Sequence, residues 1–65
     1  MRNRLRVIRA EMNISQQRLS EMSGVPRVTI GLIETEAKNP SAETIIKLVR
    51  ATGIPANKIF YDLDV

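Results

Sequence analysis

Apolar residues recur at spacings of three and four along much of this 65-residue chain, which is the period of helices with one buried face. Leu5, Ile8 and Met12 have this spacing near the start of the chain. Together with residues that begin and end helices, the pattern predicts five helices, over residues 3–12, 16–23, 26–35, 41–52 and 55–60. A chain of this length has room for one domain, residues 1–65, with a small core.

The residues between the second and third predicted helices favour a tight turn. Ser15 can accept a hydrogen bond from a free amide at the start of the second helix. Gly24 follows that helix where the chain needs a positive φ, and Pro26 suits the first turn of the next helix. Two short helices joined in this way form a helix-turn-helix, whose second helix can enter the major groove of DNA.

The residues of this motif and those after it match the pattern of a known family in register. The matching residues are Gln16, Leu19, Gly24, Val25, Arg27, Thr29, Ile30, Ile33, Glu34, Asn39, Pro40, Ser41, Thr44, Leu48, Gly53, Ile54, Ile59 and Phe60. Over residues 3–60 the chain resembles the phage-repressor family of helix-turn-helix proteins (Cro/CI-like, also called XRE). The resemblance implies an all-α fold, a compact bundle of four or five helices, that binds operator DNA as a dimer.

The second helix of the motif, residues 26–35, is the predicted reading helix. Its outward and edge positions are Arg27, Val28, Thr29, Gly31, Leu32 and Thr35. Arg27 can hold O6 and N7 of a guanine, or it can neutralise a phosphate. Thr29 can donate a hydrogen bond to a phosphate or contact a base edge.

Two positions of this helix depart from the family's usual chemistry. Val28 and Leu32 are apolar where Gln, Ser, Asn or Arg are common. If Gly31 permits close approach, these side chains can contact thymine methyl groups, which predicts an A·T-rich operator. The alternative is that this apolar face binds a protein partner.

Four further residues are candidates for contacts with the DNA backbone. The resemblance implies such a contact for Gln16, in the first turn of the helix over residues 16–23, and Gln17 is a neighbouring candidate. Lys38 and Asn39, in the loop after the reading helix, can reach the phosphates beside the groove, as their counterparts in the family often do.

The resemblance also implies one structural ion pair. Arg9 and Glu34 stand where the family commonly joins its first and third helices, so we predict that they pair. The alternative is two solvated charges. Glu36 stands where the family usually carries glycine, and the loop after the reading helix is therefore a second departure from the pattern.

Charge and composition agree with a nucleic-acid partner. Of the net charge of +3, residues 1–32 hold +4 and residues 33–65 hold −1, so the basic half contains the reading helix. An ordinary solvated surface can show the same bias. The chain has no Cys and no His, which removes the usual nucleophiles, general bases and metal ligands, so we expect neither catalysis nor a metal or cofactor.

No apolar run approaches the ~18 residues that span a bilayer, and no signal peptide follows the basic start. We therefore expect a cytoplasmic protein, associated with the nucleoid, that makes no membrane contact.

Apolar and acidic residues alternate after Tyr61, which suits a short C-terminal strand, although a frayed terminus fits equally. The expected dimer interface contains Ile59, Phe60, Tyr61 and Leu63.

These observations predict a sequence-specific transcription regulator that binds double-stranded DNA. A repressor that binds a palindromic operator as a homodimer is the simplest form. The alternative is an antitoxin or adaptor that uses the same fold mainly to bind another protein.

Overall fold

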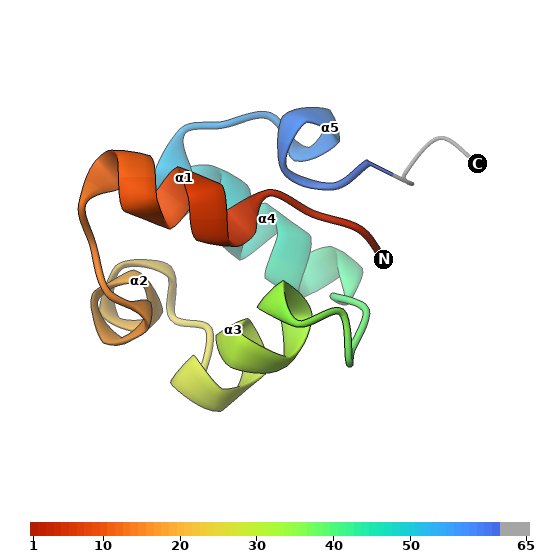
Figure 1. Cartoon of the computed structure of the whole chain (residues 1–65), viewed down its shortest axis with the longest axis horizontal. Helices are drawn as coiled ribbons and strands as arrows, with labels where there is room; N and C mark the ends of the chain where they lie inside the picture. Colours follow the sequence, from red (N-terminus) through yellow and green to blue (C-terminus); the bar gives the residue numbers. More distant parts are fainter. Residues whose placement is uncertain (62–65) are drawn as a thin grey trace.

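The computed structural model describes residues 1–61, and these residues form five helices (Figure 1). In chain order they are α1 (Leu5–Met12), α2 (Gln16–Ser23), α3 (Arg27–Glu34), α4 (Ala42–Thr52) and α5 (Ala56–Ile59). The expected all-α bundle is thereby confirmed. None of these five helices combines the length and the apolar composition that crossing a membrane requires.

Capping residues set where the helices begin. The Oγ of Ser15 accepts a hydrogen bond from the Arg18 N–H at 2.9 Å, and the Oγ of Ser41 accepts one from the Thr44 N–H at 3.2 Å. Both bonds satisfy an amide that has no partner within its helix. The helices α3, α4 and α5 each start one residue later than predicted, because the residue expected to be first is the cap.

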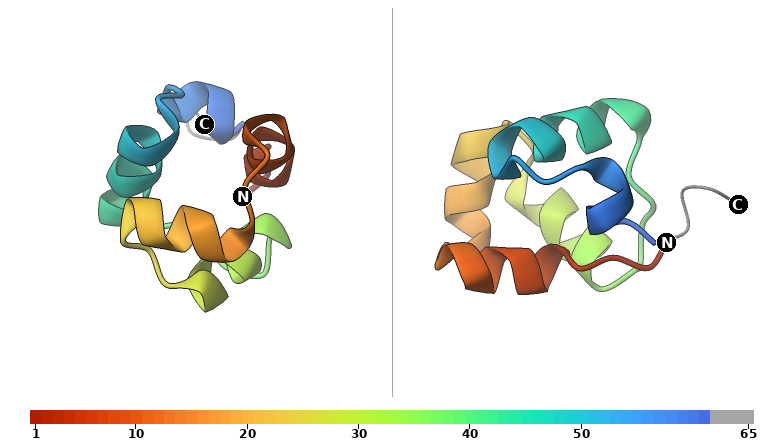
Figure 2. Two further views of the ribbon diagram at one scale, coloured as in Figure 1. Left: turned by 90° about the vertical axis from the view of Figure 1, so that its left-hand side faces the viewer. Right: turned by 90° about the horizontal axis from the view of Figure 1, so that it is seen from above.

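The segment before α1 lies antiparallel to the segment after α5 (Figure 2). The N–H of Arg4 donates to the carbonyl of Ile59 at 2.8 Å, and Asn3 forms a β-bridge with Phe60. This extended pairing explains why α1 begins two residues later than predicted. The C-terminal strand that the sequence suggested falls on residues 62–65, outside the described residues.

Every helix contributes to the hydrophobic core. Its buried residues are Leu5, Ile8, Leu19, Val25, Ile30, Ile33, Leu48, Ile59 and Phe60. Burying a side chain of this size contributes roughly 1.5–3 kcal/mol. The side chains of Ile59 and Phe60 are therefore not at the surface, where the expected contact with a second copy requires them. They lie inside because their segment pairs with the start of the chain.

Four of the helices end at a residue in the left-handed region. Asn13, Gly24 and Gly53 are residue types that favour it, but Glu36 after α3 has φ +65°. The N–H of Glu36 donates to the carbonyl of Ile33 at 3.0 Å. The N–H of Ala37 donates to the carbonyl of Leu32 at 2.9 Å. These two bonds form a Schellman motif. The chain keeps the backbone shape that glycine would favour, with glutamate in its place.

Replacing Glu36 with glycine should therefore stabilise the fold. The left-handed conformation costs an L-residue roughly 1–2 kcal/mol, and the greater freedom of glycine in the unfolded chain offsets part of the gain. We expect a net increase of ~0.5–1 kcal/mol in the free energy of unfolding, measured in urea. As a control, Ala37→Gly, at a position without positive φ, should lower it. A loss of stability in Glu36→Gly would contradict this account.

Candidate nucleic-acid interface

The turn between α2 and α3 is held by its own backbone and by the core. The N–H of Gly24 donates to the carbonyl of Ser20 at 2.9 Å, with φ +79° at the glycine. Val25 is buried, and its N–H donates to the Oγ of Ser23 at 3.1 Å. The turn thus sets α3 across α2. In Figure 2 (left), α3 lies at one edge of the bundle and α5 at the opposite edge.

The two faces of α3 differ as the sequence predicted. Ile30 and Ile33 are fully buried in the core. On the outer side Val28 is 64% exposed and Leu32 is 40% exposed, and Arg27 is also exposed. The helix therefore presents a cation and two apolar side chains to the outside, while its other face is fixed in the core.

Gly31 lies beside the amide of Gln16. A Cβ added to Gly31 would come within 3.7 Å of Gln16 Nε2 and 3.8 Å of its Oε1, which is ordinary contact distance. The packing of α2 against α3 therefore has room for a methyl group, and the fold does not require glycine here.

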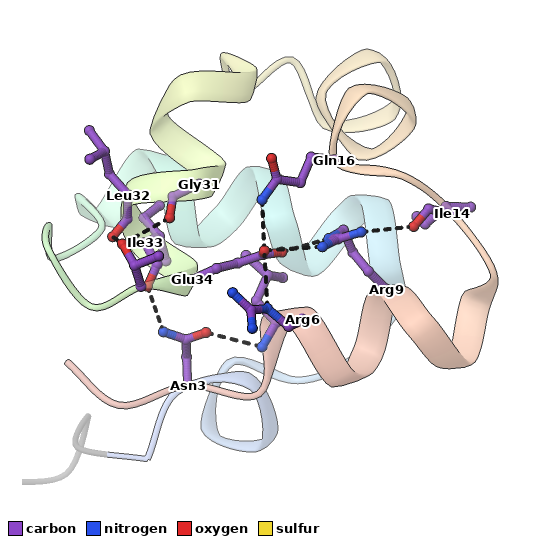
Figure 3. A network of polar contacts seen from close by, with 11 residues as sticks. Asn3, Arg6, Arg9, Ile14, Gln16, Gly31, Leu32, Ile33 and Glu34 are labelled. Atoms are coloured by element: carbon purple, nitrogen blue, oxygen red, sulfur yellow. Dashed lines mark hydrogen bonds and ion pairs between the residues drawn. The ribbon is translucent and has the colours of Figure 1, made fainter.

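The carboxylate of Glu34, at the end of α3, is the centre of a polar network (Figure 3). Arg9 holds both of its oxygens, from Nε to Oε2 at 2.6 Å and from Nη2 to Oε1 at 3.1 Å. Gln16 Nε2 donates to Oε1 at 2.9 Å, and Arg9 Nη1 donates to the carbonyl of Ile14 at 3.0 Å. The Glu34 side chain has no exposed surface. This network joins α1, α2 and α3.

The network also keeps Glu34 ionised. Burial acts to raise the pKa of Glu34, but hydrogen bonds from Arg9 and Gln16, with the attraction of Arg9 and Arg6, lower it below its ordinary value. The hydrogen bond to Glu34 raises the pKa of Arg9. Both groups are charged at neutral pH.

A residue that sequence reasoning missed, Asn3, connects the segment before α1 to the same carboxyl end of the reading helix. Its Nδ2 donates to the carbonyl of Ile33 at 2.8 Å, and its Oδ1 accepts from the N–H of Leu5 at 3.1 Å (Figure 3). The bond to Leu5 is of the local kind that asparagine side chains often form with nearby backbone groups. The bond to Ile33, 30 residues further along, has no local signal.

The remaining candidates lie on α2, on or next to α3, and in the loop after α3. Gln17 is exposed on α2, and Lys38 and Asn39 are exposed in the loop after α3. The Oδ1 of Asn39 accepts from the terminal ammonium at 2.6 Å. The hydroxyl of Thr35 donates to carbonyls of its own helix, at 3.1 and 3.2 Å, and Thr29 is half-buried.

Tyr61 is the one residue of the expected dimer interface that the structure places at the surface. Its ring lies 5.9 Å from the Arg2 guanidinium carbon, in a cation–π arrangement. Leu63 lies outside the described residues.

Replacing Arg9 should show how much the buried ion pair with Glu34 contributes to the stability of the fold. Arg9→Met leaves Glu34 without its main partner, so we expect a loss of ~3–5 kcal/mol in unfolding free energy at neutral pH. The ionised Glu34 contributes its full stabilisation of the fold above the pKa that it has in the unfolded chain, ordinarily 4.5. This stabilisation is lost as the pH falls through the lower pKa that Glu34 has in the folded protein. The gap between wild type and Arg9→Met should therefore narrow in acid.

Urea unfolding at neutral pH and below pH ~4 measures both effects. Arg18→Met is the matched control, because Arg18 pairs with Glu21 on the surface at 3.5 Å. That substitution should change stability by less than ~1 kcal/mol. Equal effects of the two substitutions would show that burial of the Glu34 pair is unimportant.

Comparison with known proteins places the chain in a family. A family model described as helix-turn-helix matches residues 5–59. The HTH-type transcriptional regulator PuuR of Escherichia coli is 33% identical over 57 residues, which are 88% of this chain and 31% of PuuR. An uncharacterized HTH-type transcriptional regulator of Archaeoglobus fulgidus is 35% identical over 60 residues, which are 92% of this chain and 84% of that protein.

The control protein C.SmaI of Serratia marcescens is 40% identical over 45 residues, which are 66% of this chain and 54% of the relative. The chain thus spans less than a third of PuuR but most of the archaeal protein. The family match runs from the first residue of α1 to the last of α5 and includes the motif formed by α2 and α3. The chain therefore belongs to the Cro/CI-like (XRE) family of helix-turn-helix DNA-binding proteins.

Proposed function

We propose that this chain is a sequence-specific transcription regulator that binds double-stranded DNA with α3 in the major groove. The observation that carries the proposal is the position of α3. One face of it is locked by the core and by Glu34, and the other face, with Arg27, Val28 and Leu32, is exposed at the edge of the bundle. The names of the relatives, HTH-type transcriptional regulators, support the same function.

The exposed face of α3 suits A·T-rich DNA. Val28 and Leu32 are the apolar groups that would contact thymine methyls in the major groove. Gly31 lets the DNA come close to this face, because it carries no side chain. Arg27 at the amino end of the helix reaches either a guanine edge or a phosphate.

Backbone contacts on both sides of α3 would set its depth in the groove. The amide of Gln16 uses one of its two N–H groups on Glu34 and has a second to donate to a phosphate. Gln17 on α2, and Lys38 and Asn39 in the loop after α3, are exposed as well. Contacts of this kind fix register and orientation without reading sequence.

In the simplest arrangement two copies bind a palindromic operator and repress by blocking polymerase. Their reading helices must then lie ~34 Å apart to meet successive major grooves. Exposed Tyr61 is the described residue of the expected interface that is free to face a second copy. An antitoxin or adaptor role is the second candidate, because the exposed Val28 and Leu32 also suit a protein partner.

Selection from random duplex DNA at near-physiological salt tests the proposal directly. We expect an A·T-rich palindrome with half-sites about one helical turn apart, measured by sequencing the retained duplexes. Recovery of no motif, with only salt-sensitive binding to all duplexes, would contradict it. Stoichiometric capture of a protein by the Val28–Leu32 face would then favour the adaptor role.

Gly31→Ala should change the stability of the fold and the affinity for DNA in opposite directions. Alanine fits beside Gln16 and favours the helix, so stability should rise by ~0.5–1 kcal/mol. The added methyl lies on the face proposed to approach DNA, where overpacking costs about 1–3 kcal/mol, so affinity for the selected site should fall about tenfold. A fall in affinity together with greater stability cannot result from misfolding. Unchanged affinity would exclude close approach at Gly31.

A further inference from the structure

Arg6 on α1 is a cation beside the Glu34 network that attracts Glu34 but donates none of the hydrogen bonds to it. Its Nε lies 4.0 Å from Glu34 Oε1, and its side chain is 70% exposed. The two Glu34 oxygens already accept three N–H groups, two from Arg9 and one from Gln16. Because the Arg6 side chain is mostly in solvent, its attraction to Glu34 is screened and adds less to stability than the hydrogen bonds from Arg9. The charge of Arg6 is therefore available for another partner.

The position of Arg6 suggests what that partner is. Arg6 Nε and Gln16 Nε2 both approach Oε1 of Glu34, at 4.0 and 2.9 Å, so the two nitrogens lie within about 7 Å of each other (Figure 3). Two oxygens of one phosphate can accept from donors at this separation, since each hydrogen bond spans about 2.7–3.2 Å. We infer that Arg6 binds the DNA backbone with Gln16, at one shared phosphate. This inference rests on the proposed DNA-binding function.

Electrostatics explain why a phosphate at Gln16 needs Arg6. The Gln16 amide donates to the buried carboxylate of Glu34. A phosphate bound to the same amide would therefore lie close to the negative charge of Glu34. Arg9 cancels that charge through its two hydrogen bonds. Arg6 then makes the cluster of two arginines and one glutamate positive by one unit. A guanidinium also matches phosphate geometry better than a single ammonium does.

The salt dependence of binding tests this assignment. The probe is a duplex carrying the selected site, titrated between ~50 and 200 mM salt with wild type, Arg6→Gln and Arg6→Lys. Each phosphate neutralised contributes about 0.9 to the slope of log K against log salt, so Arg6→Gln should flatten the slope by about 0.9 per bound chain. Arg6→Lys should keep the slope. Gln16→Ala should lower affinity and leave the slope unchanged, because an amide carries no charge.

Arg50→Gln is the matched control, because it removes the same charge in the last turn of α4, which leads toward α5 and away from α3 (Figure 1). Its slope should equal that of wild type. The melting temperature of Arg6→Gln should fall far less than that of Arg9→Met, because the attraction of Arg6 to Glu34 is screened by solvent. The double variant of Arg6 and Gln16 should lose less affinity than the two single losses combined, because both groups hold one phosphate.

An unchanged slope in Arg6→Gln, an equal flattening in Arg50→Gln, or fully additive losses in the double variant would each overturn the assignment. So would a melting temperature of Arg6→Gln lowered as far as that of Arg9→Met, which would mean that the charge serves mainly the fold. Failure of the wild type to bind any duplex would instead refute the proposed function itself.

Discussion

The buried carboxylate of Glu34 is the constraint on which the arrangement of α1, α2 and α3 depends. A carboxylate without exposed surface is tolerated only if other groups replace its lost hydration. Arg9 and Gln16 do so from two other helices, so α3 can end only where both reach it. The same bonds that compensate for burial therefore fix the orientation of the reading helix. The outer face of α3 remains available for a ligand.

A second set of bonds acts on the backbone at the same carboxyl end of α3. Asn3 accepts a hydrogen bond from the first amide of α1 and donates one to the carbonyl of Ile33, while the segment around it pairs with the segment around Phe60. The start of the chain, the end of α3 and the end of α5 thus share one junction. A partner that displaced the segment around Phe60 would disturb its pairing with Asn3, which is hydrogen-bonded to the reading helix at Ile33.

Much of the fold and part of the site follow from local signals. Helix period, capping serines and the positive φ of Gly24 depend on neighbouring residues, and these placed the five helices to within one or two residues of their ends. The exposure of Val28 and Leu32 follows from the same period, since Ile30 and Ile33 occupy the opposite face. Glu36 retained the left-handed geometry because backbone hydrogen bonds at the end of α3 outweigh its residue preference.

The sequence by itself therefore determined the helices, their buried faces and the helix-turn-helix, because these rest on interactions within a few residues. Only the tertiary structure decided that Ile59 and Phe60 belong to the core, and that Asn3 reaches Ile33 across 30 residues. It also decided that Arg6 and Gln16 approach the same oxygen of Glu34. Each of these depends on how separate helices pack. Contacts between residues far apart in the sequence produce no periodic or local pattern from which they could be predicted.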